Sequence, residues 1–170
     1  MKKAMVILVL ALLPGTLFAE TVMLLTRVKP DQSKPHVAVE QSIAVEDGVE
    51  DQFFSSGHII FDAGISDQVK AAPNSVNGSD GWAEETAKSG GATFLLIVSL
   101  EYAAATRSAI LPSAATYRFM DLKTGSTLAE GNVDTKAPES ELKTKKPYEI
   151  AFALGQKIAK FVMTSWEPTS

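Results

Sequence analysis

The sequence predicts an α/β fold, specifically an α/β sandwich in which helices pack on a mixed sheet, with elements in the order β-α-β-α-β-β-β-α. Three observations support this order. Residues 94–98 form an unbroken apolar run, which is typical of a strand buried on both faces. Upstream of that run, a helical segment followed by glycine and then a strand occurs twice. Downstream of it, two segments of alternating polarity flank a glycine-containing turn, which indicates an antiparallel hairpin.

The first strand and the first helix are separated by a proline-containing turn. Residues 21–28 are mainly apolar and form the first predicted strand. From about residue 40 to residue 56, apolar residues recur at steps of three and four, which predicts an amphipathic helix. The apolar face of that helix contains Val45, Val49 and Phe53, with Phe54 beside them. Gly57 is placed to end the helix in a left-handed conformation, and residues 58–62 begin the next strand.

A second helix leads into the apolar strand at the centre of the chain. Ser79 and Asp80 are both suitable N-cap residues, and the helix is expected to run to about Ser89. The glycines at 90–91 end it, and the strand at 92–102 follows directly.

The second half of the chain is predicted to be a hairpin followed by one helix. The two strands of the hairpin are expected at 115–122 and 127–133. The last helix begins at Pro147 and has the strongest helical pattern in the chain. The stretches 64–81 and 134–146 are rich in polar residues and contain proline, so loops are expected there.

The amino terminus has the pattern of a secretory leader. Lys2 and Lys3 precede an apolar run at 4–13, and Ala19 is the small residue that signal peptidase requires. A run of about ten residues is too short for a retained membrane anchor, since spanning a bilayer takes about twenty. We therefore expect residues 1–19 to be a signal peptide and the protein to be periplasmic or secreted.

The remaining chain, 20–170, has the length of one domain. The whole sequence has a formal net charge of −4, and the chain without the two leader lysines has a formal net charge of −6. This balance argues against nucleic-acid partners, whose binding depends on cationic side chains. The sequence contains no cysteine, so neither a lipid anchor on cysteine nor a disulfide is expected.

Three segments together resemble a known periplasmic family. They are the helix end at 56–58, the glycines before the strand at 94–98, and the hairpin at 117–125. The pattern resembles the α/β family that includes the amino-terminal domain of TolB, the curli secretion protein CsgG and the penicillin-binding-protein activator LpoB. This chain lacks the lipid-bearing cysteine of CsgG and LpoB and the propeller that follows in TolB. The resemblance implies a stand-alone envelope domain that binds another protein, and it implies no catalytic residues.

The side chains that enzymes most often use are scarce. The chain has two histidines and no G-x-S-x-G, G-x-x-x-x-G-K or G-x-G-x-x-G motif. His36 and Glu40 are four residues apart, but two ligands do not complete a metal site. We therefore expect a protein that is not an enzyme and that binds neither a metal nor a cofactor.

Two groups of residues are candidates for binding. Acidic residues of the first helix are expected to form an outer face that attracts a basic protein partner. They are Glu46, Asp47, Glu50 and Asp51. The alternative is a small-ligand binding protein or a hydrolase, with a pocket at the carboxyl ends of the strands. That pocket would use His58, Asp62 and the loop at 64–80.

Overall fold

A computed structural model describes residues 20–29, 35–62, 81–102, 111–136 and 139–166. The strands are β1 (Thr21–Lys29), β2 (Ile59–Asp62), β3 (Phe94–Glu101), β4 (Ala114–Asp121) and β5 (Thr127–Val133). The helices are α1 (Pro35–Ser55), α3 (Gly81–Ser89), α4 (Glu139–Thr144) and α5 (Pro147–Ser165).

The strands form one mixed sheet in the order β2-β1-β3-β4-β5. Strand β1 pairs in parallel with both β2 and β3, whereas β4 and β5 are added as antiparallel strands. The predicted α/β fold is therefore confirmed. Strand β3 is central, and its residues 94–98 are all buried, as the apolar run predicts.

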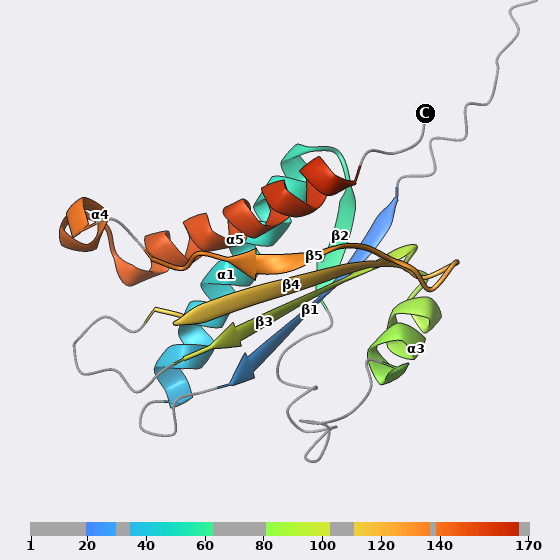
Figure 1. The fold of residues 1–170 in the computed structure, drawn as a ribbon, viewed down its shortest axis with the longest axis horizontal. Coiled ribbons are helices and arrows are strands. Elements are labelled where there is room, and N and C mark those ends of the chain that lie inside the picture. Colours follow the sequence, from blue (N-terminus) through green and yellow to red (C-terminus); the bar gives the residue numbers. More distant parts are fainter. Residues whose placement is uncertain (1–19, 30–34, 63–80, 103–110, 137–138, 167–170) are drawn as a thin grey trace, which may run out of the picture.

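Helices cover both faces of the sheet (Figure 1). Helices α1 and α5 pack side by side on one face, and α3 packs on the other. The chain passes outward from β1 to β2 and then returns across β1 to β3. Because crossover connections are almost always right-handed, this reversal of direction places α1 and α3 on opposite faces.

The larger core lies between the sheet and the helices α1 and α5. Alternate residues of β1 and β3 point into it, including Leu24, Leu96 and Val98. At one end of this core Trp166 packs against the rings of Phe94 and Phe119, at centroid distances of 4.7 and 5.1 Å. The smaller core lies under α3 and contains Met23, Leu25, Leu95, Ile97 and Leu122 from the sheet side.

Glycines allow α1 and α5 to approach very closely. A Cβ atom added to Gly48 would lie 2.0 Å from the carbonyl oxygen of Phe152, and one added to Gly155 would lie 2.0 Å from that of Val45. Any larger residue at either position would separate the two helices. This contact fixes α1 relative to α5 and therefore the surface that α1 presents.

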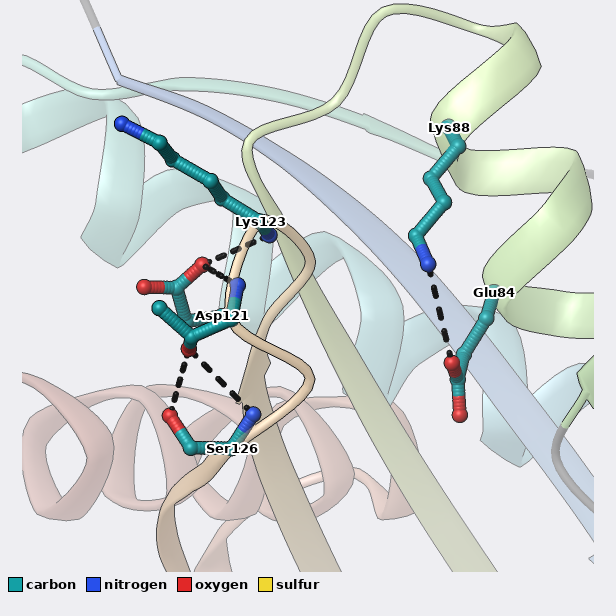
Figure 2. Close-up of polar contacts among 6 residues, drawn as sticks. Glu84, Lys88, Asp121, Lys123 and Ser126 are labelled. Carbon is teal, nitrogen blue, oxygen red and sulfur yellow. Dashed lines mark hydrogen bonds and ion pairs between the residues drawn. The ribbon is translucent and has the colours of Figure 1, made fainter.

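The β4–β5 hairpin closes as the sequence predicts (Figure 2). Asp121 Oδ1 accepts hydrogen bonds from the backbone N–H groups of Lys123 and Thr124, at 2.7 and 3.1 Å. The hydroxyls of Thr124 and Ser126 are 2.7 Å apart and hydrogen-bonded. Gly125 has φ +71°, a conformation that glycine adopts without steric cost.

Two boundaries differ from the predictions. Helix α1 begins at Pro35, about five residues earlier than expected, because proline is well suited to the first turn and Ala38 joins the core. Helix α4 occupies part of the predicted loop at 134–146, where Lys145 Nζ pairs with Glu141 Oε2 at 3.3 Å. The other elements agree with the predictions to within two residues, a margin normal for helix and strand ends.

None of the helices in the described ranges combines the length and hydrophobicity needed to cross a bilayer. The predicted leader and the loop at 64–80 lie outside the described residues.

Candidate functional site

The acidic residues of α1 do not all lie on an outer face. Glu46 is only 6% exposed, so the prediction that it belongs to a solvated face was wrong. Asp47 and Glu50 are half-buried, and Asp51 is exposed. Helical periodicity placed these residues away from the apolar stripe but did not reveal that β1 and β2 extend under Glu46.

Glu46 is enclosed without full hydrogen bonding. Its Oε1 atom and the Oγ1 atom of buried Thr26, on β1, have no hydrogen-bond partner among the described residues. Burial, and then the negative charge of Asp62 on β2, raise the pKa of Glu46 to about 8. Burial and the charge of Asp62 also raise the pKa of Glu50. Because its pKa is about 8, the Glu46 carboxyl is mainly neutral at pH 7.

Helix α5 holds two of the α1 carboxylates by hydrogen bonds. The Tyr148 hydroxyl donates to Asp47 Oδ2 at 2.8 Å, and Gln156 Nε2 donates to Asp51 Oδ2 at 2.9 Å. The bond to Asp47 raises the pKa of Tyr148, because the phenolate would repel the carboxylate. Both bonds fix the orientation of acidic side chains of α1 against α5.

A groove of about 280 Å³ lies between α1 and the edge strand β2. It is lined by Asp47, Glu50, Asp51, Phe54 and Ile60. The Phe54 side chain is 78% exposed, although the sequence places it beside the apolar face of the helix. This groove combines carboxylates with an exposed aromatic ring.

Strand β2 also exposes an apolar side chain at this edge, on the face of the sheet opposite Ile60 and the groove. Ile59 is 52% exposed, and β2 is the outermost strand on its side of the sheet. Within the described residues, no group of three or more histidine, aspartate or glutamate side chains has the geometry of a metal site. The acidic surface around the groove is called the α1/β2 surface below. It consists of Asp47, Glu50, Asp51, Phe54 and Ile60.

His58 and Asp62 do not share one end of the sheet. His58 precedes β2 and Asp62 is its last residue, so they lie at opposite ends of that strand. The His58 ring packs on Trp166 at 4.7 Å and near Phe53 at 5.9 Å, and its Nδ1 atom is 3.9 Å from Glu20 Oε2. The histidine therefore belongs to an aromatic cluster at the amino ends of the parallel strands.

A second groove, which the sequence did not suggest, lies on the sheet itself. It has a volume of about 420 Å³ and is lined by residues of four neighbouring strands. Its polar residues are Arg27, Ser99, Thr116, Arg118, Glu130 and Asn132. The available signal was polar residues at alternate positions of predicted strands, but that pattern also describes an ordinary solvated sheet face.

Comparison with solved structures reveals the same fold in other proteins. PelC from Paraburkholderia phytofirmans, solved as a dodecamer, is 12% identical over 85% of this chain and 86% of its own, with a TM-score of 0.52. The chain shares its fold with PelC. At this level of identity, the likeness concerns the fold alone.

Two of the proteins named above for their sequence pattern are also similar in structure. The LpoB carboxyl-terminal domain from Salmonella enterica is 15% identical over 68% of this chain and 81% of its own, with a TM-score of 0.40. TolB from Acinetobacter baumannii is 11% identical over 86% of this chain and 28% of its own, with a TM-score of 0.44. The fold-level resemblance to these periplasmic domains is confirmed. No family model matches the chain, and no curated protein matches its sequence.

Proposed function

We propose that this protein is an envelope domain that acts by binding a protein partner, and that the partner's contact segment is basic. One observation carries the proposal: the α1/β2 surface places an exposed phenylalanine among carboxylates that other residues hold in position. Carboxylates attract and orient a basic partner, while an aromatic ring supplies contact area.

The energetic contributions of the two components differ. Burying a phenylalanine side chain against a partner contributes about 1.5–3 kcal/mol. Charges at the rim mainly accelerate association and select against acidic partners. Phe54 is therefore expected to determine the lifetime of the complex, and the carboxylates its rate of formation and its specificity.

The position of β2 favours an extended partner segment. An edge strand presents backbone groups that can pair with an added strand, and alternate side chains of that strand then reach the same face. A strand added beside β2 would run along the groove that α1 and β2 form. We therefore propose an extended segment with lysine or arginine near its apolar residues.

The proposed location is the periplasm or cell exterior, after removal of residues 1–19. The leader pattern at residues 1–19 supports export. We propose binding without catalysis, because His58 packs among aromatic rings and is 3.9 Å from Glu20, too far for a hydrogen bond. The hydrolase alternative is weakened because His58 and Asp62 lie at opposite ends of β2.

Partner capture from envelope extracts tests the proposal. The immobilised mature chain is compared with the variant D47N/E50Q/D51N and with the control E84Q/E85Q/E130Q, which removes as many charges elsewhere. Recovery of the partner is expected to fall about tenfold for the first variant and to remain unchanged for the control, since loss of about 1.4 kcal/mol produces that factor. Equal recovery with all three proteins would contradict the proposal.

Self-assembly is a second candidate, because PelC was solved as a dodecamer. The junction of α4 and α5 exposes Lys145 and Lys146, which a neighbouring copy could place against the α1 carboxylates. Light scattering after size-exclusion chromatography distinguishes the two candidates. An oligomer that dissociates both in high salt and in K145Q/K146Q would favour self-assembly, and a monomer at all salt concentrations would exclude it.

A further inference from the structure

We propose that the groove on the sheet face is a second binding site, which takes a small ligand with carboxylate or phosphate groups between Arg27 and Arg118. This site lies apart from the α1/β2 surface. It is assigned from the register of four strands and from the chemistry of the side chains that line the groove.

Strand register places the polar side chains in two adjacent rows. Arg118 is paired with Ile97 on β3 and with Glu130 on β5. The second row lies two residues along β4 from Arg118 and crosses β1, β3, β4 and β5. It consists of Arg27, Ser99, Thr116 and Asn132, in that order. Because alternate residues of a strand point to the same face, both rows project on the face that α3 partly covers.

The change from an apolar to a polar face occurs within single strands. On β3 the side chains of this face are Leu95, Ile97 and then Ser99, and on β1 they are Met23, Leu25 and then Arg27. The apolar members belong to the core under α3, and the polar members line the groove. The groove therefore begins where the α3 core ends.

The lining matches an oxyanion rather than a cation. A guanidinium group presents parallel N–H donors that fit carboxylate and phosphate oxygens. The hydroxyls of Ser99 and Thr116 and the amide of Asn132 can donate further hydrogen bonds or bind hydroxyl groups of a ligand. The residues that line the groove include two arginines and one glutamate, although the whole chain carries a negative formal charge.

Glu130, the acidic residue of the groove, forms only a long and exposed ion pair with Arg118. Arg118 Nε is 3.7 Å from Glu130 Oε2, and the two side chains are 45% and 67% exposed. A pair as exposed as this contributes little, so a ligand that engages the guanidinium with better geometry can displace the carboxylate. Glu130 then acts as a competitor that lowers the affinity of the site for anions.

The dimensions indicate a ligand of modest size. The volume of about 420 Å³ is within the range of small-molecule sites. Arg27 and Arg118 lie on strands that are separated by β3, so their Cα atoms are on the order of 10 Å apart. Two long side chains at that separation suit a ligand with two anionic groups, or with one such group and several hydroxyls.

Nuclear magnetic resonance of the arginine Nε–H groups in the mature chain tests the site. The probes are succinate and inorganic phosphate, titrated at constant ionic strength against sodium chloride as reference. The larger response identifies the preferred headgroup. Shifts are expected for Arg27 and Arg118 together, and the D47N/E50Q/D51N variant is expected to respond as the wild type does.

Substitutions separate a specific site from general charge attraction. R27Q and R118Q are each expected to weaken binding of the preferred probe about tenfold, since a hydrogen bond to a charged group contributes about 1.5–3 kcal/mol. E130Q is expected to strengthen binding about threefold, and K88Q on α3 should have no effect. The absence of a response to both probes, or equal binding by R27Q, R118Q and wild type, would overturn the proposal.

Discussion

At the scale of single residues, Glu46 has the most unusual environment among the described carboxylates. It is buried beside Thr26, and Asp62 and Glu50 add negative charge around it. An acid whose pKa is raised in the folded state remains protonated there after it has ionised in the unfolded chain. Its contribution to stability therefore decreases as pH rises from about 4.5 towards about 8 and is constant above that range.

Replacement of Glu46 by glutamine tests this environment. E46Q mimics the protonated carboxyl at every pH, so its stability should equal that of the wild type near pH 5. At pH 9 the variant should be more stable by about 2 kcal/mol, since a difference of one in pKa corresponds to about 1.4 kcal/mol and relaxation reduces the full effect. Urea unfolding from pH 5 to pH 9 measures the difference. A difference that does not change with pH would contradict the assignment.

Phe53 and Phe54 are adjacent in sequence but differ in their surroundings. Phe53 is fully buried in the main core, whereas Phe54 is largely exposed at the groove. F53A is expected to cost about 3–5 kcal/mol of folding free energy, whereas F54A should change it by less than about 0.5 kcal/mol. Denaturant unfolding of the two variants measures both values. A large loss with F54A would mean that this ring supports the fold and is not available to a partner.

At the scale of elements, the contact between α1 and α5 is the most sensitive to substitution. G48A and G155A would each place a methyl group against a backbone carbonyl that cannot move without separating the helices. Each variant is expected to lose about 3 kcal/mol of stability or more, at the upper end of overpacking effects. The control is G90A, where the nearest atoms lie at 3.4 Å. If thermal unfolding showed that G155A is as stable as G90A, that result would contradict the close contact between the helices.

Most elements could be predicted from the sequence because their signals are local. The apolar run 94–98, the turn at Gly125 and the period of α5 each depend on neighbouring residues, and each is confirmed. The burial of Glu46 and the exposure of Phe54 depend on the position of β2 relative to α1. The periodicity of a single helix carries no information about that position. The groove on the sheet requires the register of four strands, so it could not be predicted from any single segment.

At the scale of the whole molecule, the α1/β2 surface and the groove on the sheet face occupy different parts of the fold. The α1/β2 surface is acidic and lies at the edge formed by β2, while the arginine groove spans β1 to β5 on the face that α3 partly covers. Under the two proposals, one domain has separate positions for a basic partner and for an anionic ligand. Binding at one is expected to leave the other accessible.

The proposed export concerns the whole chain. If residues 1–19 are a leader, expression in a bacterium with a periplasm should yield a mature chain that begins at Glu20. Intact mass spectrometry of the periplasmic fraction measures this directly. Recovery of the uncut chain in the cytoplasm alone would contradict the proposed location.

The central claim is that the α1/β2 surface binds a basic partner segment, and site-specific photo-crosslinking tests it most directly. A photoreactive phenylalanine analogue is placed at Phe54 and, as a control, at Phe161, which is 44% exposed on α5. After irradiation in cells, mass spectrometry identifies the attached peptides. We predict that position 54 yields a lysine- or arginine-containing segment of one partner, that D47N/E50Q/D51N abolishes this product, and that position 161 does not yield it. Identical products from both positions, or none from position 54, would contradict the claim.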